Sequence, residues 1–392
     1  MKPVYMDNNA TTRVADEVYE AMQPYFTEHY GNASSMYSFA AEAGKAIKKA
    51  REQVAALLNC SPDEILFTSC GTESDNTAVK SVMEAHPSKH HIITSRVEHP
   101  AIRTTCRHMK QRFGCSLTEL PVDGQGMINL DELRSNLRDD TGLVTIMHAN
   151  NETGVIFPIE QITNMVKERG AIMHTDAVQT VGKLPLDMKK LPVDMLSISG
   201  HKLHAPKGVG ALFVRRGVKL PPMIHGGHQE GGKRGGTENV PYIVGLGVAC
   251  EEAMKYMDDE NTRVKKLRDK LQEGLMTNSQ DAYLNGHPDL RLPNTANISF
   301  EYVEGEAILL LLDAHAICAS SGSACTSGSL EPSHVLRAMG VPFTRAHGSI
   351  RFSLSRYTTE EEVDFVIEKI PPIIERLRSM SPFGRSQKAM SS

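Results

Sequence analysis

Between residues 60 and 215, short β-rich runs alternate with segments of helical length. The runs lie at residues 64–68, 91–94, 143–147, 171–174, 195–198 and 211–214, and helical segments at 72–85, 101–113 and 159–169 separate several of them. Repeated strand–helix alternation predicts a mainly parallel sheet with helices on both faces, an α/β fold. Such sheets bind ligands beyond the carboxyl ends of their strands. We therefore expect the functional residues directly after the strands.

Past residue 240 the pattern changes. Val264, Leu267, Leu271 and Leu275 fall at helical spacing in a charged stretch, which predicts a long amphipathic connecting helix. Strand-like runs at 297–300, 317–319 and 349–354, followed by a helix over 359–380, predict a smaller α+β domain. We assign residues 15–260 to the large domain, 1–14 and 261–380 to the small domain, and 381–392 to a mobile tail.

Composition excludes several functional classes. The seven cysteines form no C-x-x-C pair, which argues against a disulfide framework or a cysteine-rich zinc site. A net charge of -4 argues against a nucleic-acid partner. The longest apolar stretch, residues 307–312, is far below the ~20 residues of a membrane span, and no secretory segment follows Met1. We expect a cytoplasmic protein that binds neither nucleic acid nor membrane.

Four polar positions after predicted strands suit one cofactor. Lys202, in a Gly/Pro-rich loop, is placed to form a Schiff base, because its amine must be partly desolvated to be nucleophilic. Residues 67–75 run from a strand into a helix, a turn that suits a phosphate. Asp176 could pair with a protonated pyridine nitrogen, and His99 could stack on a flat ring. Each position has a common structural explanation, such as a helix cap, but together they predict a pyridoxal-phosphate pocket.

These motifs carry a family resemblance over nearly the whole chain. They lie at residues 5–12 (YMDNNATT), 67–76 (FTSCGTESDN), 97–100 (VEHP), 148–154 (HANNETG), 174–179 (HTDAVQ), 199–202 (SGHK), 234–239 (RGGTEN), 320–328 (SSGSACTSG) and 349–353 (SIRFS). The sequence resembles the cysteine desulfurases of the class V aminotransferase group. Its Cys70-Gly71-Thr72 variant and its Asp-Asn-Asn-Ala opening are similar to the NifS-like, nitrogen-fixation branch. The resemblance implies an aminotransferase-like large domain with a mainly parallel seven-stranded sheet, and a homodimer.

The resemblance also implies a role for individual residues. Lys202 would carry pyridoxal phosphate, Asp176 would pair with its ring nitrogen, Gln179 would bond its ring hydroxyl, and His99 would stack on the ring. The residues implied to hold the phosphate are Gly71, Thr72, Ser199 and His201, joined by Thr237 of the other subunit. Asn151, also counted among the cofactor-binding residues, and Arg351 would bind the carboxylate of the substrate, since a guanidinium grips a carboxylate bidentately.

Cys325 differs from the other cysteines in its surroundings. It lies among small polar residues without a large apolar anchor, so we expect an exposed, mobile thiol. By contrast, Cys60 and Cys250 end apolar helical patterns, and we expect Cys318 to face the interior. Because a thiolate attacks sulfur, the resemblance implies that L-cysteine yields L-alanine and a persulfide on Cys325. The sulfur would pass to an iron–sulfur scaffold protein, with transient contact of Cys325 to a cluster and no resident metal.

Other activities remain open at this point. A selenocysteine lyase or another class V enzyme would keep the cofactor, whereas a non-catalytic iron–sulfur assembly protein would leave Lys202 and Asp176 without a purpose. Residues 227–233 fit the core of a nucleotide-binding loop, but Arg234 stands where Ser or Thr should ligate Mg²⁺.

The family pattern near residue 32 is also altered, because Ala33, Tyr37 and Ala40 replace a proline, a histidine and a glycine that are common there.

Overall fold

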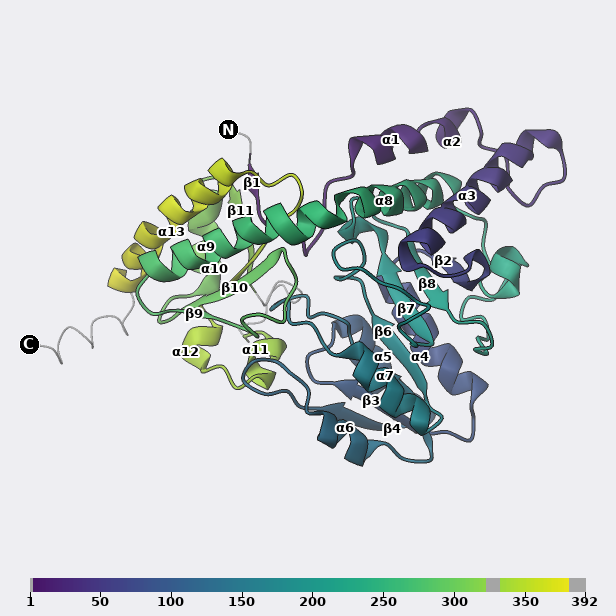
Figure 1. Cartoon of the computed structure of the whole chain (residues 1–392), viewed down its shortest axis with the longest axis horizontal. Coiled ribbons are helices and arrows are strands. Elements are labelled where there is room, and N and C mark those ends of the chain that lie inside the picture. Colours follow the sequence, from purple (N-terminus) through teal and green to yellow (C-terminus); the bar gives the residue numbers. More distant parts are fainter. Residues whose placement is uncertain (1–2, 322–331, 381–392) are drawn as a thin grey trace, which may run out of the picture.

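The computed structural model describes residues 3–321 and 332–380 of the 392-residue chain. Its main feature is a seven-stranded sheet in the order β2-β8-β7-β6-β5-β3-β4 (Figure 1). The strands are β2 (Ile65–Thr68), β3 (His91–Ser95), β4 (Ser116–Leu120), β5 (Thr141–Thr145), β6 (Ile172–Asp176), β7 (Met195–Ser199) and β8 (Gly210–Val214). β8 pairs antiparallel with β2 and β7, and the other pairs are parallel. The α/β class and the mainly parallel seven-stranded sheet are therefore confirmed.

Successive strand residues face opposite sides of this sheet, as the two-residue period of a strand requires. Ile92 packs on one face with α4 (Gly71–Ala85) and α5 (Pro100–Phe113), while Ile93 packs on the other. The helices on that second face are α1 (Asp16–Met22), α3 (Ala41–Leu58), α7 (Ile159–Glu168) and α8 (Val240–Asp259). Because both faces are covered, only the strand ends are left for polar chemistry.

A separate hydrophobic core lies C-terminal to this sheet. There, an antiparallel sheet in the order β12-β13-β10-β9 packs against helices on the left of Figure 1. The elements are β9 (Ala282–Leu284), β10 (Thr295–Phe300), β12 (Ser320–Ser321), β13 (Ser349–Ser353), α9 (Lys265–Asn278), α10 (Gly305–Asp313) and α13 (Glu360–Met380). The N-terminal strand β1 (Val4–Tyr5) joins this part by pairing with β11 (Ile317–Cys318). The smaller α+β region is thus observed, while its exact boundaries stay a prediction.

One helical path connects the two parts. α8 continues through a π-helical turn, η5 (Glu260–Val264), into α9, which is the connecting helix expected from its apolar spacing. Glu260, the first residue of this turn, and Lys183 are both buried, and Lys183 Nζ donates to the carbonyl of Gln179 at 3.2 Å. The junction therefore holds two ionisable groups within the protein interior.

The structure also corrects some expectations. β4 was missed because, as an edge strand, it is only partly buried and lacks a continuous apolar run; the short β1 and β9 were missed as well. Cys318 is half-buried on β11, so the expectation that it faces the interior stays a prediction. The remaining helices are α2 (Pro24–Thr27), α6 (Leu130–Asn136), α11 (His334–Ala338) and α12 (Phe343–Ala346).

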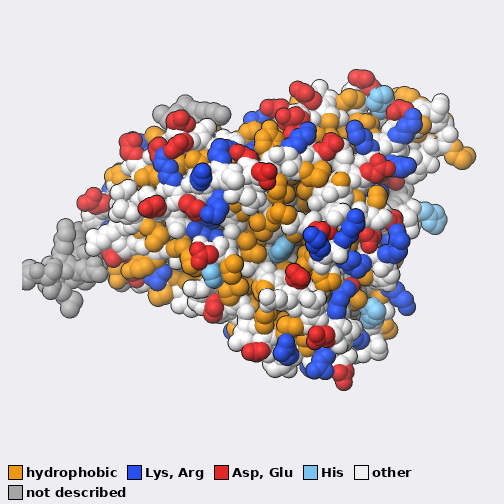
Figure 2. Space-filling model, viewed as in Figure 1, with side chains coloured by type: hydrophobic (Ala, Val, Ile, Leu, Met, Phe, Trp, Pro, Cys, Tyr) orange, Lys and Arg blue, Asp and Glu red, His pale blue; other side chains and the backbone are white. Residues whose placement is uncertain are grey.

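Surface properties agree with the charge count. Acidic and basic side chains are both spread over the face shown in Figure 2. Among the helices of the described residues, none has the length and apolar character needed to cross a membrane. The predicted tail over 381–392 and the segment with Cys325 lie outside the described residues.

Candidate active site

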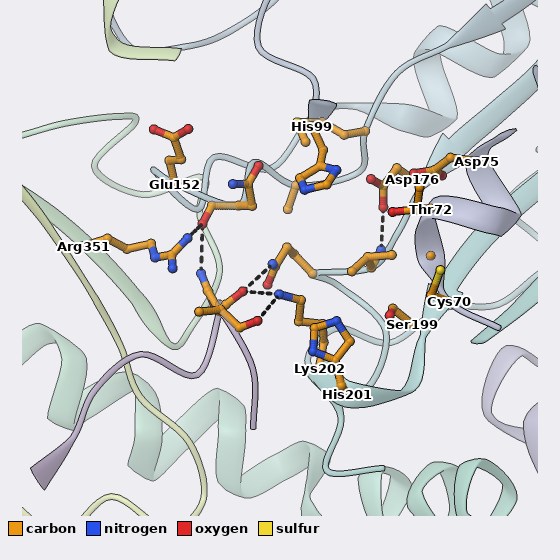
Figure 3. Close-up of a pocket in the computed structure, with 18 of the residues that line it drawn as sticks. Cys70, Thr72, Asp75, His99, Glu152, Asp176, Ser199, His201, Lys202 and Arg351 are labelled. Atoms are coloured by element: carbon orange, nitrogen blue, oxygen red, sulfur yellow. Dashed lines mark hydrogen bonds between the residues drawn. The ribbon is translucent and has the colours of Figure 1, made fainter. Parts of the chain in front are cut away.

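A cavity of about 380 Å³ opens at the carboxyl ends of the central strands, where the two parts of the molecule meet. Figure 3 shows Arg351 entering it from one side, with Asp176 and Thr72 at the other and Lys202 and His99 between them. The lining residues that the sequence predicted are Gly71, Thr72, His99, Asn151, Asp176, Gln179, Ser199, His201, Lys202 and Arg351. Segments nearly 300 residues apart thus contribute to one cavity.

Lys202 follows β7 on a short 3-10 turn. Its Nζ donates to the carbonyls of Asn9 and Ala10, the latter at 2.7 Å, so the amine points across the cavity floor to the N-terminal segment. The preceding His201 bonds the hydroxyl of Thr11 at 3.1 Å. Burial, together with the neighbouring Lys202, lowers the pKa of His201 to about 4. A neutral imidazole therefore stands beside the amine at physiological pH.

Asp176 is the last residue of β6, the strand next to β7. Its Oδ1 accepts from the backbone N–H of Val178 at 2.9 Å. Burial raises the pKa of Asp176, whereas His99 and Lys202 pull it down. Close by, Gln179 Nε2 donates to the carbonyl of Asn9 at 3.1 Å, while its Oε1 has no hydrogen-bond partner among the described residues. This end of the cavity therefore offers a buried carboxylate and an unused amide oxygen.

The N-terminus of α4 forms another wall. A Cβ at Gly71 would lie 2.8 Å from Val178 Cγ2 and 3.2 Å from Ser199 Cβ, so only glycine fits this approach of helix and strand. Thr72 and Ser199 present hydroxyls to the cavity, and the fifteen-residue helix directs its first N–H groups there. Backbone donors and the positive helix end favour an anion at this position.

His99 caps α5, with its Nδ1 accepting from the N–H of Ala101 at 3.2 Å. Burial lowers the pKa of His99, against the opposing effect of Asp176. The ring is thereby held by one nitrogen on the cavity wall, where a flat ligand could contact its face (Figure 3). Its geometry suits stacking and proton transfer through the other nitrogen.

Arg351, on β13, supplies the opposite wall. Its Nη1 donates to the carbonyl of Asn151 at 2.9 Å, and its Nη2 contacts Asp7 Oδ1 at 2.8 Å. Its Nε is buried without a hydrogen-bond partner among the described residues. Since an unpaired buried donor is costly, this nitrogen indicates a site for a ligand acceptor such as a carboxylate.

Sequence reasoning missed several groups in this cavity. Asp75 is 1% exposed, and burial together with the charge of Asp176 raises its pKa well above the ordinary value. Burial raises the pKa of Glu152 to about 7, while its carboxylate accepts from the hydroxyl of Ser333. Asp75 lies three residues after Thr72, one helical turn along α4, so helical spacing could have found it. Glu152 carried no such signal.

Two predicted site residues are not in the cavity as described. Thr237 is exposed and does not line it. Cys325 lies in 322–331, outside the described residues. The roles assigned to both stay predictions.

The rival nucleotide-binding motif lacks the strand that should precede such a loop. Residues 227–233 form a loop with a four-residue 3-10 turn, η4 (Gln229–Gly232), preceded by no strand in residues 215–228. The described part of the chain contains no cluster of three or more His, Cys, Asp or Glu side chains that could hold a metal ion.

Comparison with known proteins places this cavity in a family. The class V aminotransferase model matches residues 4–366. A cysteine desulfurase of Trichormus azollae is 59% identical over 99% of this chain and 96% of its own length. The cysteine desulfurase NifS of Azotobacter vinelandii is 56% identical over 98% and 95%. A solved structure of a NifS-like protein superposes with a TM-score of 0.90 at 44% identity, covering 96% of this chain and 100% of that one.

These matches span the large sheet, the small sheet and every described residue that lines the cavity. The chain therefore belongs to the class V aminotransferase family, in its group of NifS-like cysteine desulfurases.

Proposed function

We propose that this protein is a pyridoxal-phosphate-dependent cysteine desulfurase that converts L-cysteine to L-alanine and an enzyme-bound persulfide on Cys325. The observation that carries the proposal is the geometry of three groups on one cavity. The amine of Lys202 and the carboxylate of Asp176 come from the ends of adjacent strands, and the guanidinium of Arg351 faces them from the other part of the molecule.

The cavity fits pyridoxal phosphate by the chemistry of its walls. Asp176 would pair with the ring nitrogen, the unused Oε1 of Gln179 would accept from the ring hydroxyl, and His99 would stack on the ring. The phosphate would lie at the N-terminus of α4, held by Gly71, Thr72, Ser199 and His201. When bound through Lys202, the cofactor supplies an electron sink for bonds broken at the amino acid.

The chain's own residues would then act on the substrate in turn. Arg351 and Asn151 hold the carboxylate of L-cysteine, and Lys202 moves a proton at the substrate carbon. The thiolate of Cys325 attacks the substrate sulfur, so that an S–S bond forms as the C–S bond breaks. L-Cysteine and the Cys325 thiol thus become L-alanine and the Cys325 persulfide, with no atom or electron left over.

The same proposal includes the oligomeric state, the cellular location and the sulfur acceptor of the enzyme. Two copies would form a homodimer in the cytoplasm, with Thr237 of each reaching the phosphate of the other, which accounts for its exposure in a single chain. The persulfide sulfur would pass to an iron–sulfur scaffold protein. Similarity to NifS favours cluster supply for nitrogen fixation.

Two substitutions test the assignment. Cys325→Ala should abolish sulfide release from L-cysteine while leaving the visible absorbance of the bound cofactor, and Lys202→Ala should remove that absorbance. Cys60→Ala, at a half-buried thiol remote from the cavity, is the control and should keep activity. Sulfide release by Cys325→Ala at the wild-type rate would refute the persulfide role. Faster alanine formation from selenocysteine than from cysteine would instead favour a selenocysteine lyase.

A further inference from the structure

A second carboxylate, Asp7, lies on the arginine that is proposed to bind substrate. Asp7 Oδ1 contacts Arg351 Nη2 at 2.8 Å, and Asp7 Oδ2 accepts from the hydroxyl of Ser320 at 3.1 Å. Both side chains of the ion pair are largely buried, with exposed fractions of 8% for Arg351 and 17% for Asp7. At such a site a charge interaction is screened much less than at the surface.

The backbone fixes Asp7 in this position. On one side of it Met6 N–H donates to the carbonyl of Cys318 at 2.9 Å and Met6 accepts from Ser353 N–H at 2.8 Å; on the other, Asn8 N–H donates to the carbonyl of Ser353 at 3.1 Å. Because both chain neighbours and both carboxylate oxygens are bonded, Asp7 is not free to leave when a ligand arrives. It is therefore a permanent part of the site.

The guanidinium still has capacity for a ligand. Nη1 is bonded to the carbonyl of Asn151 and Nη2 to Asp7, but the buried Nε has no partner among the described residues. Among the described residues, the five N–H groups of this guanidinium make only these two hydrogen-bonded contacts. A ligand carboxylate can therefore bind beside Asp7, and two negative groups then share one positive charge.

We propose that Asp7 is an affinity-determining residue: it partly neutralises Arg351, so that the site holds a single monocarboxylate weakly enough to release it. This inference rests on the proposed function, in which Arg351 binds the substrate carboxylate. The amino acid product carries the same carboxylate as the substrate. Without a neighbouring carboxylate, the guanidinium would bind the carboxylates of substrate and product equally tightly. Binding energy that stays the same throughout the reaction does not raise kcat. Asp7 thereby favours turnover over retention of L-alanine.

Asp7→Asn tests the charge without removing the acceptor, because the amide oxygen can still receive the Nη2 hydrogen bond. We expect the holoenzyme of this variant to bind L-alanine about tenfold more tightly than wild type, since one like-charge repulsion is lost. The measurement is a titration of the cofactor absorbance with L-alanine, repeated with propionate as a competitor that has no amino group. Propionate should also bind more tightly, and added salt should reduce the difference.

Ser320→Ala is the matched control, because it removes the other hydrogen bond of the same carboxylate and leaves the ion pair. Its L-alanine affinity should stay at the wild-type value. Unchanged or weaker binding in Asp7→Asn, or equal tightening in Ser320→Ala, would overturn the role of Asp7. Arg351→Gln separates the two hypotheses: if it fails to weaken L-alanine binding, the carboxylate assignment of the proposed function is itself wrong.

Discussion

The two walls of the cavity are built in different ways. On the wall of the large sheet, Asp176 ends one strand, Lys202 follows another, and Thr72 lies in the first turn of the helix after a third. Each side chain is therefore placed by its own strand–turn unit. On the opposite wall, Arg351 is held by Asp7 and by the carbonyl of Asn151, which are 344 and 200 residues away along the chain. One wall is local in sequence, and the other depends on long-range contacts.

This difference matches the division of labour in the proposed reaction. The local wall would hold the cofactor, which stays in place from turnover to turnover. The long-range wall would meet the substrate and product, which come and go. A rigid strand end suits the first task, whereas a site shared between two parts of the molecule allows the second to be tuned by residues such as Asp7.

The largest effect is expected on the cofactor wall. Asp176→Asn removes the carboxylate that would pair with the ring nitrogen, and we expect kcat for L-cysteine to fall about a thousandfold, the scale of losing one preorganised electrostatic contact. KM should change little, because the contact is not with the substrate carboxylate. Asp194→Asn is the control, since that carboxylate is also buried but pairs with Lys167 at 3.0 Å, away from the cavity. Steady-state kinetics at saturating cofactor measure both parameters. A change in KM alone would contradict the assignment of the cofactor to one wall and of the substrate to the other.

A smaller and different effect is expected on the substrate wall. Arg351→Gln should raise KM for L-cysteine about a hundredfold with a lesser change in kcat, because a charge-assisted pair with the substrate is lost. Steady-state kinetics over a wide range of L-cysteine concentrations measure the two parameters separately. Arg345→Gln, a substitution in the same part of the molecule but outside the cavity, should leave KM unchanged. If kcat fell as far as in Asp176→Asn while KM stayed constant, the two walls would not differ in function.

The same contrast explains what the sequence alone could predict. Residues directly after strands were found because a parallel sheet brings strand ends together whatever the surrounding contacts are. Family motifs pointed to Arg351 and to the segment of Asp7, but these two residues are 344 positions apart and no local sequence pattern indicates that they form a pair. Their ion pair depends on β1 pairing with β11 in a separate two-stranded sheet, and a two-residue strand is too short to be predicted from the sequence. The unusual protonation of Asp75 and Glu152 could not be predicted for another reason: it comes from burial, which appears only in the folded structure.

The smallest effect is expected at the helical turn that joins the two parts of the molecule, and it concerns how the free energy of unfolding depends on pH. Burial raises the pKa of Glu260 to about 7 and lowers that of Lys183 to about 8. A carboxyl group with a raised folded-state pKa stabilises the fold below its unfolded pKa, and this stabilisation is lost as pH rises through the folded value. The contribution of Glu260 should therefore decline between pH 4.5 and 7.

Glu260→Gln removes this titration. Relative to wild type, the variant should gain about 2 kcal/mol in free energy of unfolding between pH 5 and pH 8, measured by urea denaturation of the holoenzyme at both values. Glu252→Gln serves as the matched control, because Glu252 is equally buried on α8 but pairs with Lys255 at the surface. An equal gain in both variants would mean that the pH dependence does not arise where the two parts of the molecule join. A slope confined to Glu260→Gln would instead locate that dependence at the turn that joins them.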